Sequence, residues 1–87
     1  MLTKDSVLTA MKEFDNNLRN TATWINWEVN RGPHLYAIDH GGHRYPVKKI
    51  VSLASGVPVN QLHGGPGRAN KLIEDVGFKI VFMHPLV

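Results

Sequence analysis

The stretch of sequence that decides the fold is Tyr45-Pro46-Val47-Lys48-Lys49-Ile50-Val51-Ser52-Leu53-Ala54-Ser55-Gly56. Pro46 suits the first turn of a helix, where its missing N–H has no partner to lose, and Gly56 is a typical stop residue. The apolar residues between them recur on one helical face: Val47, Ile50, Val51 and Ala54. The stretch therefore predicts a helix that buries this face and leaves Lys48 and Lys49 outside.

A second helix is predicted downstream of a glycine pair. Pro66 again suits a first turn, and Gly77 takes the position after the helix. The side chains expected to face inward are Ala69, Leu72, Ile73 and Val76. Alternating residues from Phe78 to Met83 then predict a closing strand.

Upstream of the quoted stretch, the sequence predicts a β-hairpin. Residues 35–39 and 43–45 form its two arms, because His40-Gly41-Gly42 supplies residues that tolerate positive φ. Ile25, Trp27 and Val29 alternate with polar residues, which favours a short strand, with a helical turn as the alternative.

The chain should begin with an amphipathic helix over residues 4–18, because apolar residues recur there every three or four positions. Thr3 is its expected N-cap. The predicted fold is α+β, a single small domain over residues 1–87. Its expected parts are this helix, a β-hairpin or small antiparallel sheet, two further helices and the closing strand.

Length and composition restrict the class of protein. Eighty-seven residues suit one compact module, and the absence of cysteine removes disulfides and thiolate metal ligands and fits a reducing compartment. The apolar runs are far shorter than the roughly 20 residues that cross a bilayer, and the first residues lack the apolar run of a secretory signal. We therefore expect a cytoplasmic protein with no membrane partner.

The positive charge is concentrated in the second half of the chain. The formal charge is +3, yet acidic residues exceed basic ones by five to four over residues 1–43. From residue 44 onward, six basic residues face two acidic ones. This asymmetry favours an anionic partner, although scattered lysines also keep small domains in solution.

A candidate anion site lies at Gly64-Gly65-Pro66-Gly67-Arg68. Backbone N–H groups of a glycine-rich turn at a helix start attract phosphate, and Arg68 and Lys71 are placed to contact the same group. The alternative is that Gly64 and Gly65 only allow a tight turn. The turn is not a Walker loop, since no Gly-Lys-Ser or Gly-Lys-Thr ends it.

Further candidate contacts are basic or aromatic. Arg44, Lys48 and Lys49 are expected to contact phosphates without reading bases, or else to form a solvated face. Trp24 is the candidate for base stacking, whereas Trp27 and Tyr45 are expected in the core.

No catalytic set or metal site is expected. Asp39, His40 and His43 crowd one turn that has few ways to bring further ligands. His63 near a serine lacks a flanking elbow motif and an orienting carboxylate. The sequence thus predicts neither enzyme activity nor a cofactor.

The order of motifs resembles the N-terminal head domain of ScoMcrA-like type IV, modification-dependent restriction endonucleases. The resemblance rests on Tyr45-Pro46-x-Lys48-x-Ile50, Leu53-Ala54-x-Gly56, Gly64-Gly65, Asn70, Leu72 and Gly77-Phe78-x-Ile80. It extends upstream to Phe14-Asp15 and the hairpin. Many members carry Phe-Ser where this chain has Leu62-His63. The resemblance implies a supporting role on DNA beside nuclease, helicase or modified-base-reading domains, and it implies no cleavage by these residues.

These observations lead to one preferred function and two alternatives. We expect a non-catalytic domain that binds DNA, duplex and possibly modified, in a restriction or anti-phage system. The first alternative is a protein-interaction module that docks a nuclease or helicase subunit. The second is a small phage or plasmid regulator.

Overall fold

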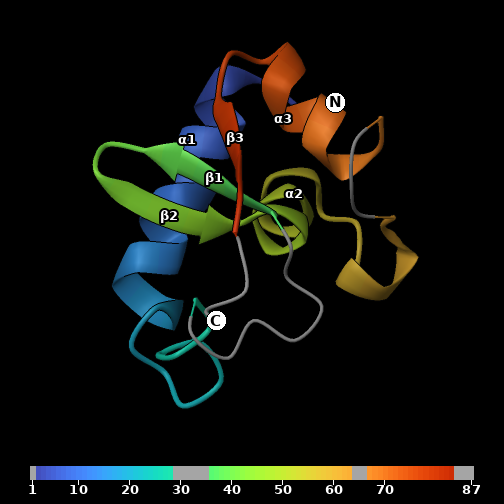
Figure 1. Cartoon of the computed structure of the whole chain (residues 1–87). Coiled ribbons are helices and arrows are strands. Elements are labelled where there is room, and N and C mark those ends of the chain that lie inside the picture. Colours follow the sequence, from blue (N-terminus) through green and yellow to red (C-terminus); the bar gives the residue numbers. More distant parts are fainter. Residues whose placement is uncertain (1, 29–35, 64–66, 84–87) are drawn as a thin grey trace.

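The computed structural model describes residues 2–28, 36–63 and 67–83, and it has the predicted α+β fold (Figure 1). The described residues contain three α-helices, three strands and two shorter helical segments, the π-helical η1 and the 3-10 helical η2. In chain order the elements are α1 (Lys4–Glu13), η1 (Phe14–Leu18), β1 (Tyr36–His40), β2 (His43–Pro46), α2 (Val47–Ser55), η2 (Val59–Gln61), α3 (Ala69–Asp75) and β3 (Lys79–Phe82).

The N-terminal helix begins at its predicted cap. The Thr3 hydroxyl accepts a hydrogen bond from the Ser6 N–H at 3.0 Å, and the Ser6 hydroxyl accepts one from the Thr3 N–H at 2.9 Å. This reciprocal capping box satisfies two backbone donors that the helix itself leaves unpaired. The helical backbone runs to Leu18 as predicted, but from Phe14 onward it widens into the π-helical η1.

The predicted hairpin is confirmed, with a turn of two residues. Gly41 and Gly42 both have positive φ, 61° and 80°, as a tight hairpin turn requires. His40 belongs to the strand rather than to the turn, because it pairs with His43. The closing strand β3 pairs antiparallel with the other edge of β1, which gives the sheet order β2-β1-β3.

The core lies between the sheet and the helices. In Figure 1, α1 runs behind the sheet, and α2 and α3 lie on its right-hand side. Helix α2 packs against both α1 and α3, and α3 also packs against β3. The largest fully buried side chains come from every layer: Phe14, Ile38, Ile50, Ile73, Val7, Val51 and Pro46. None of the helices in the described ranges combines the length and apolar content needed to span a membrane.

The short strand predicted near Trp27 is wrong for residues 25–28, and the helical-turn alternative is closer. The Ile25 N–H donates to the Thr21 carbonyl at 2.8 Å, and the Trp27 N–H donates to the Trp24 carbonyl at 3.1 Å. These local bonds satisfy the backbone without a neighbouring strand. Val29 lies outside the described residues.

The predicted inward face of α3 is also wrong in one position. Leu72 is 44% exposed, whereas Asn70 is only 3% exposed and Ile73 is fully buried. The buried face is centred on Ala69, Asn70 and Ile73, so the helix is rotated about its axis relative to the expected face. Pro46 differs from prediction as well, since it ends β2 and serves as the N-cap of α2.

Candidate nucleic-acid interface

The start of α2 presents positive charge without an internal counter-charge. Its N-cap, Pro46, makes no side-chain hydrogen bond to the first turn, and that turn contains no acidic residue. Lys48 and Lys49 lie in this turn with partly buried side chains. The partial positive charge of the helix N-terminus therefore adds to two ammonium groups, which favours a bound anion.

The start of α3 has the same character. Its N-cap is Arg68, which is exposed, and its first turn also has neither a side-chain cap nor an acidic residue. Gly67 precedes it with a φ of 77°, a conformation that favours glycine. Gly64 and Gly65, the predicted anion-binding pair, lie outside the described residues.

The basic residues of α2 and α3 differ in how far their charges are already paired. Within the described ranges, Lys48, Lys49 and Arg68 form no ion pair, whereas Lys71 Nζ lies 3.1 Å from an Asp75 carboxylate oxygen. Both side chains of this pair are more than half exposed, so water screens it and it is weak. Lys71 therefore remains available for an exchange of partners.

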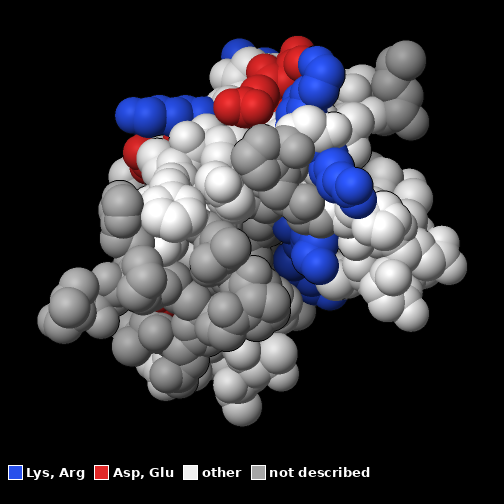
Figure 2. All heavy atoms as spheres, turned by 45° about the vertical axis from the view of Figure 1, so that its right-hand side comes forward, with Lys and Arg blue, Asp and Glu red and all other residues white. Residues whose placement is uncertain are grey.

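Basic side chains are spread over the side of the molecule that carries α2 and α3 (Figure 2). Helices α2 and α3 pack together, and Figure 2 turns that side toward the reader. Basic side chains extend from the top of the view to its recessed centre, while the acidic side chains gather near the top. We call Lys48, Lys49, Arg68 and Lys71 the basic face.

Arg44 stands apart from the basic face. It lies beside the hairpin turn in β2, three residues before α2, which corresponds to about 10 Å of extended chain. Its partner across the ladder is Asp39, an acidic residue. The predicted grouping of Arg44 with Lys48 and Lys49 is therefore looser than the sequence suggested.

Of the three aromatic residues singled out above, two lie in the core and one lies at its edge. Trp27 and Tyr45 are buried, as expected. Trp24 is partly buried, with its ring edge-on to Phe14 at 5.5 Å and to Trp27 at 6.4 Å. A base would therefore meet only the part of Trp24 that remains exposed, and stacking on it stays a prediction.

A polar cluster that sequence reasoning missed joins η1 to β2. Asp15 accepts hydrogen bonds from Arg19 Nε at 2.7 Å and from the Tyr45 hydroxyl at 2.6 Å. Arg19 also lies over the rings of Phe14 and Tyr45, at 5.0 and 4.9 Å, and donates to the Arg44 carbonyl at 2.9 Å. The spacing of Asp15 and Arg19 was a visible signal, but the link to Tyr45 was not.

The cluster shifts the acidity of both oxygen groups. Burial alone would raise the pKa of Asp15, but hydrogen bonds from Tyr45 and Arg19 outweigh it and hold that pKa below its usual value. Burial and then the hydrogen bond to Asp15 raise the pKa of Tyr45 to about 12. The shared proton therefore stays on Tyr45 at neutral pH.

A shallow pocket of about 460 Å³ adjoins the basic face, and sequence reasoning did not find it. Leu62, Ala69 and the unexpectedly exposed Leu72 give it an apolar lining. Its other lining residues are Gln61, His63, Gly67 and Arg68. The pocket therefore joins an apolar surface to a guanidinium group.

The histidine-rich hairpin turn does not assemble a metal site. His40 and His43 face each other across the ladder, but Asp39 points to the opposite side of the sheet because strand residues alternate. Across residues 2–28, 36–63 and 67–83, no three histidine, cysteine or acidic side chains gather in a way that would hold a metal ion.

Comparison with known proteins identifies one relationship. A family model described as "ScoMcrA-like, N-terminal head domain" matches residues 1–82. No curated protein and no solved structure matches the chain. The match covers nearly the whole chain and includes every described residue of the basic face.

Proposed function

This chain belongs to the family of ScoMcrA-like N-terminal head domains, and we propose that it is a non-catalytic DNA-binding module of a restriction or anti-phage defence system. It acts in the cytoplasm, where it places a nuclease or helicase domain or subunit on DNA. The DNA is duplex, with or without a base modification.

One observation carries the proposal. The starts of α2 and α3 both lack a side-chain cap and an acidic first-turn residue, and both carry basic residues without an ion pair among the described residues. Each start thus combines backbone N–H groups with cationic side chains, a combination that attracts phosphate oxygens.

The mode of binding follows from the residue types. Lysine and arginine contacts to phosphates fix the position of a protein on DNA and carry no sequence information. Lys48, Lys49 and Arg68 supply the main contacts, Lys71 joins after leaving Asp75, and the backbone of Gly64 and Gly65 approaches a phosphate. Binding is therefore sensitive to salt and tolerant of sequence.

Fluorescence anisotropy with labelled duplexes, modified and unmodified, tests the proposal at several salt concentrations. Wild type should show a log–log salt dependence with a slope of about −0.9 per phosphate contact. Replacing Lys48 and Lys49 with alanine should make this slope shallower by about two units on every duplex. Lys12→Ala is the matched control, because it removes the same charge from an exposed position on α1.

Two results would reject phosphate binding by the basic face. One is the absence of DNA binding by the folded wild type at low salt. The other is an equal loss of affinity in the Lys12→Ala control and in the Lys48→Ala and Lys49→Ala single variants.

The pocket beside Arg68 favours a second candidate function, docking of a nuclease or helicase subunit. Leu72 is 44% exposed there, and an apolar lining suits a partner side chain better than a phosphate. Such an interface should respond weakly to salt. Leu72→Ser would then weaken subunit binding and leave DNA affinity unchanged, whereas the lysine variants would do the reverse.

A further inference from the structure

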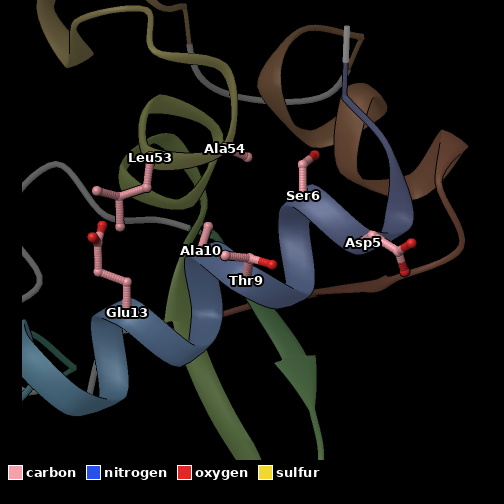
Figure 3. Close-up of a pocket in the computed structure, with 7 residues that line it drawn as sticks. All are labelled: Asp5, Ser6, Thr9, Ala10, Glu13, Leu53 and Ala54. Carbon is pink, nitrogen blue, oxygen red and sulfur yellow. The ribbon is translucent and has the colours of Figure 1, made fainter.

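A groove on another part of the surface is lined by acidic residues, in contrast to the basic face. It lies between α1 and α2 and has a volume of about 310 Å³ (Figure 3). Ala10, Leu53 and Ala54 contribute the apolar part of its lining. Asp5 and Glu13 stand toward its two ends, with Thr9 between them. The groove thus combines an apolar middle with a carboxylate at each end.

The two carboxylates have no ionic or hydrogen-bonding partner in the described parts of the chain. Among residues 2–28, 36–63 and 67–83, neither Asp5 nor Glu13 takes part in an ion pair or a side-chain hydrogen bond. Asp5 does favour the positive end of α1, but Glu13 lies at the other end of that helix, where a negative charge brings no such benefit. Negative charge on both sides of the groove also repels phosphate, so the groove is unsuited to DNA.

We infer that this groove docks a basic amphipathic helix of a partner protein or partner domain. Two packed helices form a natural seat for a third, and helix-in-groove recognition uses anchors that recur at helical spacing. Asp5 and Glu13 are eight residues apart, which is about 12 Å along α1.

The spacing defines the chemistry of the partner. Two lysines or arginines seven residues apart lie on one face of a helix, about 10.5 Å from each other. The two lysines pair with the two carboxylates, and small or aliphatic residues three and four positions after the first lysine meet Leu53 and Ala54. Ala10, which is buried, lies beneath them.

A designed peptide provides the test. The probe is an alanine-rich helix with two lysines seven positions apart and two leucines between them on the same face. The control peptide has the same composition, with both lysines moved to the opposite face. In ¹⁵N-labelled protein, the probe should shift the amide signals of Thr9, Ala10, Leu53 and Ala54, and the control should bind more weakly.

Charge variants decide the outcome. The double variant Asp5→Asn, Glu13→Gln should bind the probe about 3- to 30-fold more weakly. Because Asp5 lies in the first turn of α1, Glu13→Lys provides a second variant that leaves this turn intact. It should lose the probe and recover binding when the matching lysine of the peptide becomes glutamate.

Three results would overturn the inference. They are equal binding of probe and control peptides, unchanged affinity in both charge variants, and no shift of the groove amides at about 1 mM probe. The titration contains no DNA, so its outcome is independent of whether the basic face binds phosphate.

Discussion

The backbone N–H groups in the first turns of α1 and α2 differ in the partners that their own helix supplies. In α1, Thr3 and Ser6 cap each other and Asp5 adds a negative charge, so the helix supplies its own anionic and hydrogen-bonding partners. In α2, Pro46 offers no cap and the charged residues of the first turn are Lys48 and Lys49. The first turn of α1 is therefore self-sufficient, whereas the first turn of α2 has no such partners among the described residues and α2 relies on burial for stability.

The largest expected effect concerns the burial on which α2 relies. Ile50→Ala should lower the free energy of unfolding by about 2–5 kcal/mol, because Ile50 is fully buried and its removal leaves a cavity. Denaturant unfolding measures the change. Leu53→Ala, at a half-buried position of the same helix, should cost less. Equal and small losses in both variants would mean that burial does not hold α2.

The cap of α1 gives the next largest effect. Thr3→Ala should cost about 1 kcal/mol, because it removes the acceptor of the Ser6 N–H. Thr9→Ala is the control, since Thr9 is exposed and lies inside the helix, where alanine is at least as favourable. If the two variants unfold at the same denaturant concentration, α1 does not depend on its capping box.

A charge reversal at the start of α2 should change the stability of the protein and its affinity for duplex DNA in opposite directions. Lys48→Glu places a negative charge in an uncapped first turn and should raise the stability by about 0.3–1 kcal/mol. The same change should weaken duplex binding more than Lys48→Ala does, because it repels phosphate. Thermal melts and anisotropy titrations measure the two quantities. A parallel loss of both would show that Lys48 has a structural role.

The last effect concerns the Asp15–Tyr45 bond, which links the end of the first helix to the strand before α2 and whose contribution to stability changes only at extreme pH. The folded state lowers the pKa of Asp15, so this stabilisation is present above about pH 3.8 and is lost as the pH falls further. The pKa of Tyr45 rises from 10.0 to about 12, so its stabilisation is present below pH 10 and is lost as the pH rises to 12.

Tyr45→Phe tests this link. The variant should lose the alkaline decline of the melting temperature that occurs between pH 10 and 12 in wild type, and its acid decline should become shallower. Identical pH profiles of the two proteins would mean that the bond between Asp15 and Tyr45 contributes no stability.

Sequence patterns predicted the features that depend on local chemistry. Thr3 as a cap, the glycine turn of the hairpin and the stop at Gly56 each follow from the conformational preference of one or two residues. The α+β class followed from the order of these signals. The resemblance to the head-domain family was confirmed as well.

The predictions were wrong at positions whose conformation or burial is determined by packing between residues far apart in the sequence. Alternating polarity around Trp27 suggested a strand, but Trp24 packs edge-on against Phe14 and Trp27 packs edge-on against Trp24. The backbone N–H groups of both tryptophans donate to nearby carbonyl groups. On α3, the apolar residues predicted Leu72 inside, yet the core admits Asn70 instead. A buried amide beside an exposed leucine has no signature in a single sequence.

The candidate site was predicted in part. Lys48 and Lys49 were placed on the right helix, but Arg68 is the N-cap of α3 and not part of its first turn. The packing of α3 on α2 and on the closing strand, which the apolar faces of the two helices predict, is confirmed. The pocket beside Arg68 forms between the η2 region and the start of α3, and the acidic groove forms between α1 and α2. Both therefore became visible only in three dimensions.

The sheet order β2-β1-β3 has a consequence for how the chain assembles. β1 meets β2 across a turn of two residues, but its other partner, β3, comes from beyond α2 and α3. Closing that longer loop costs more chain entropy. During synthesis on the ribosome, the middle strand of the finished sheet therefore has one open edge until β3 emerges, and α2 can pack on α1 and α3 on α2 during that interval.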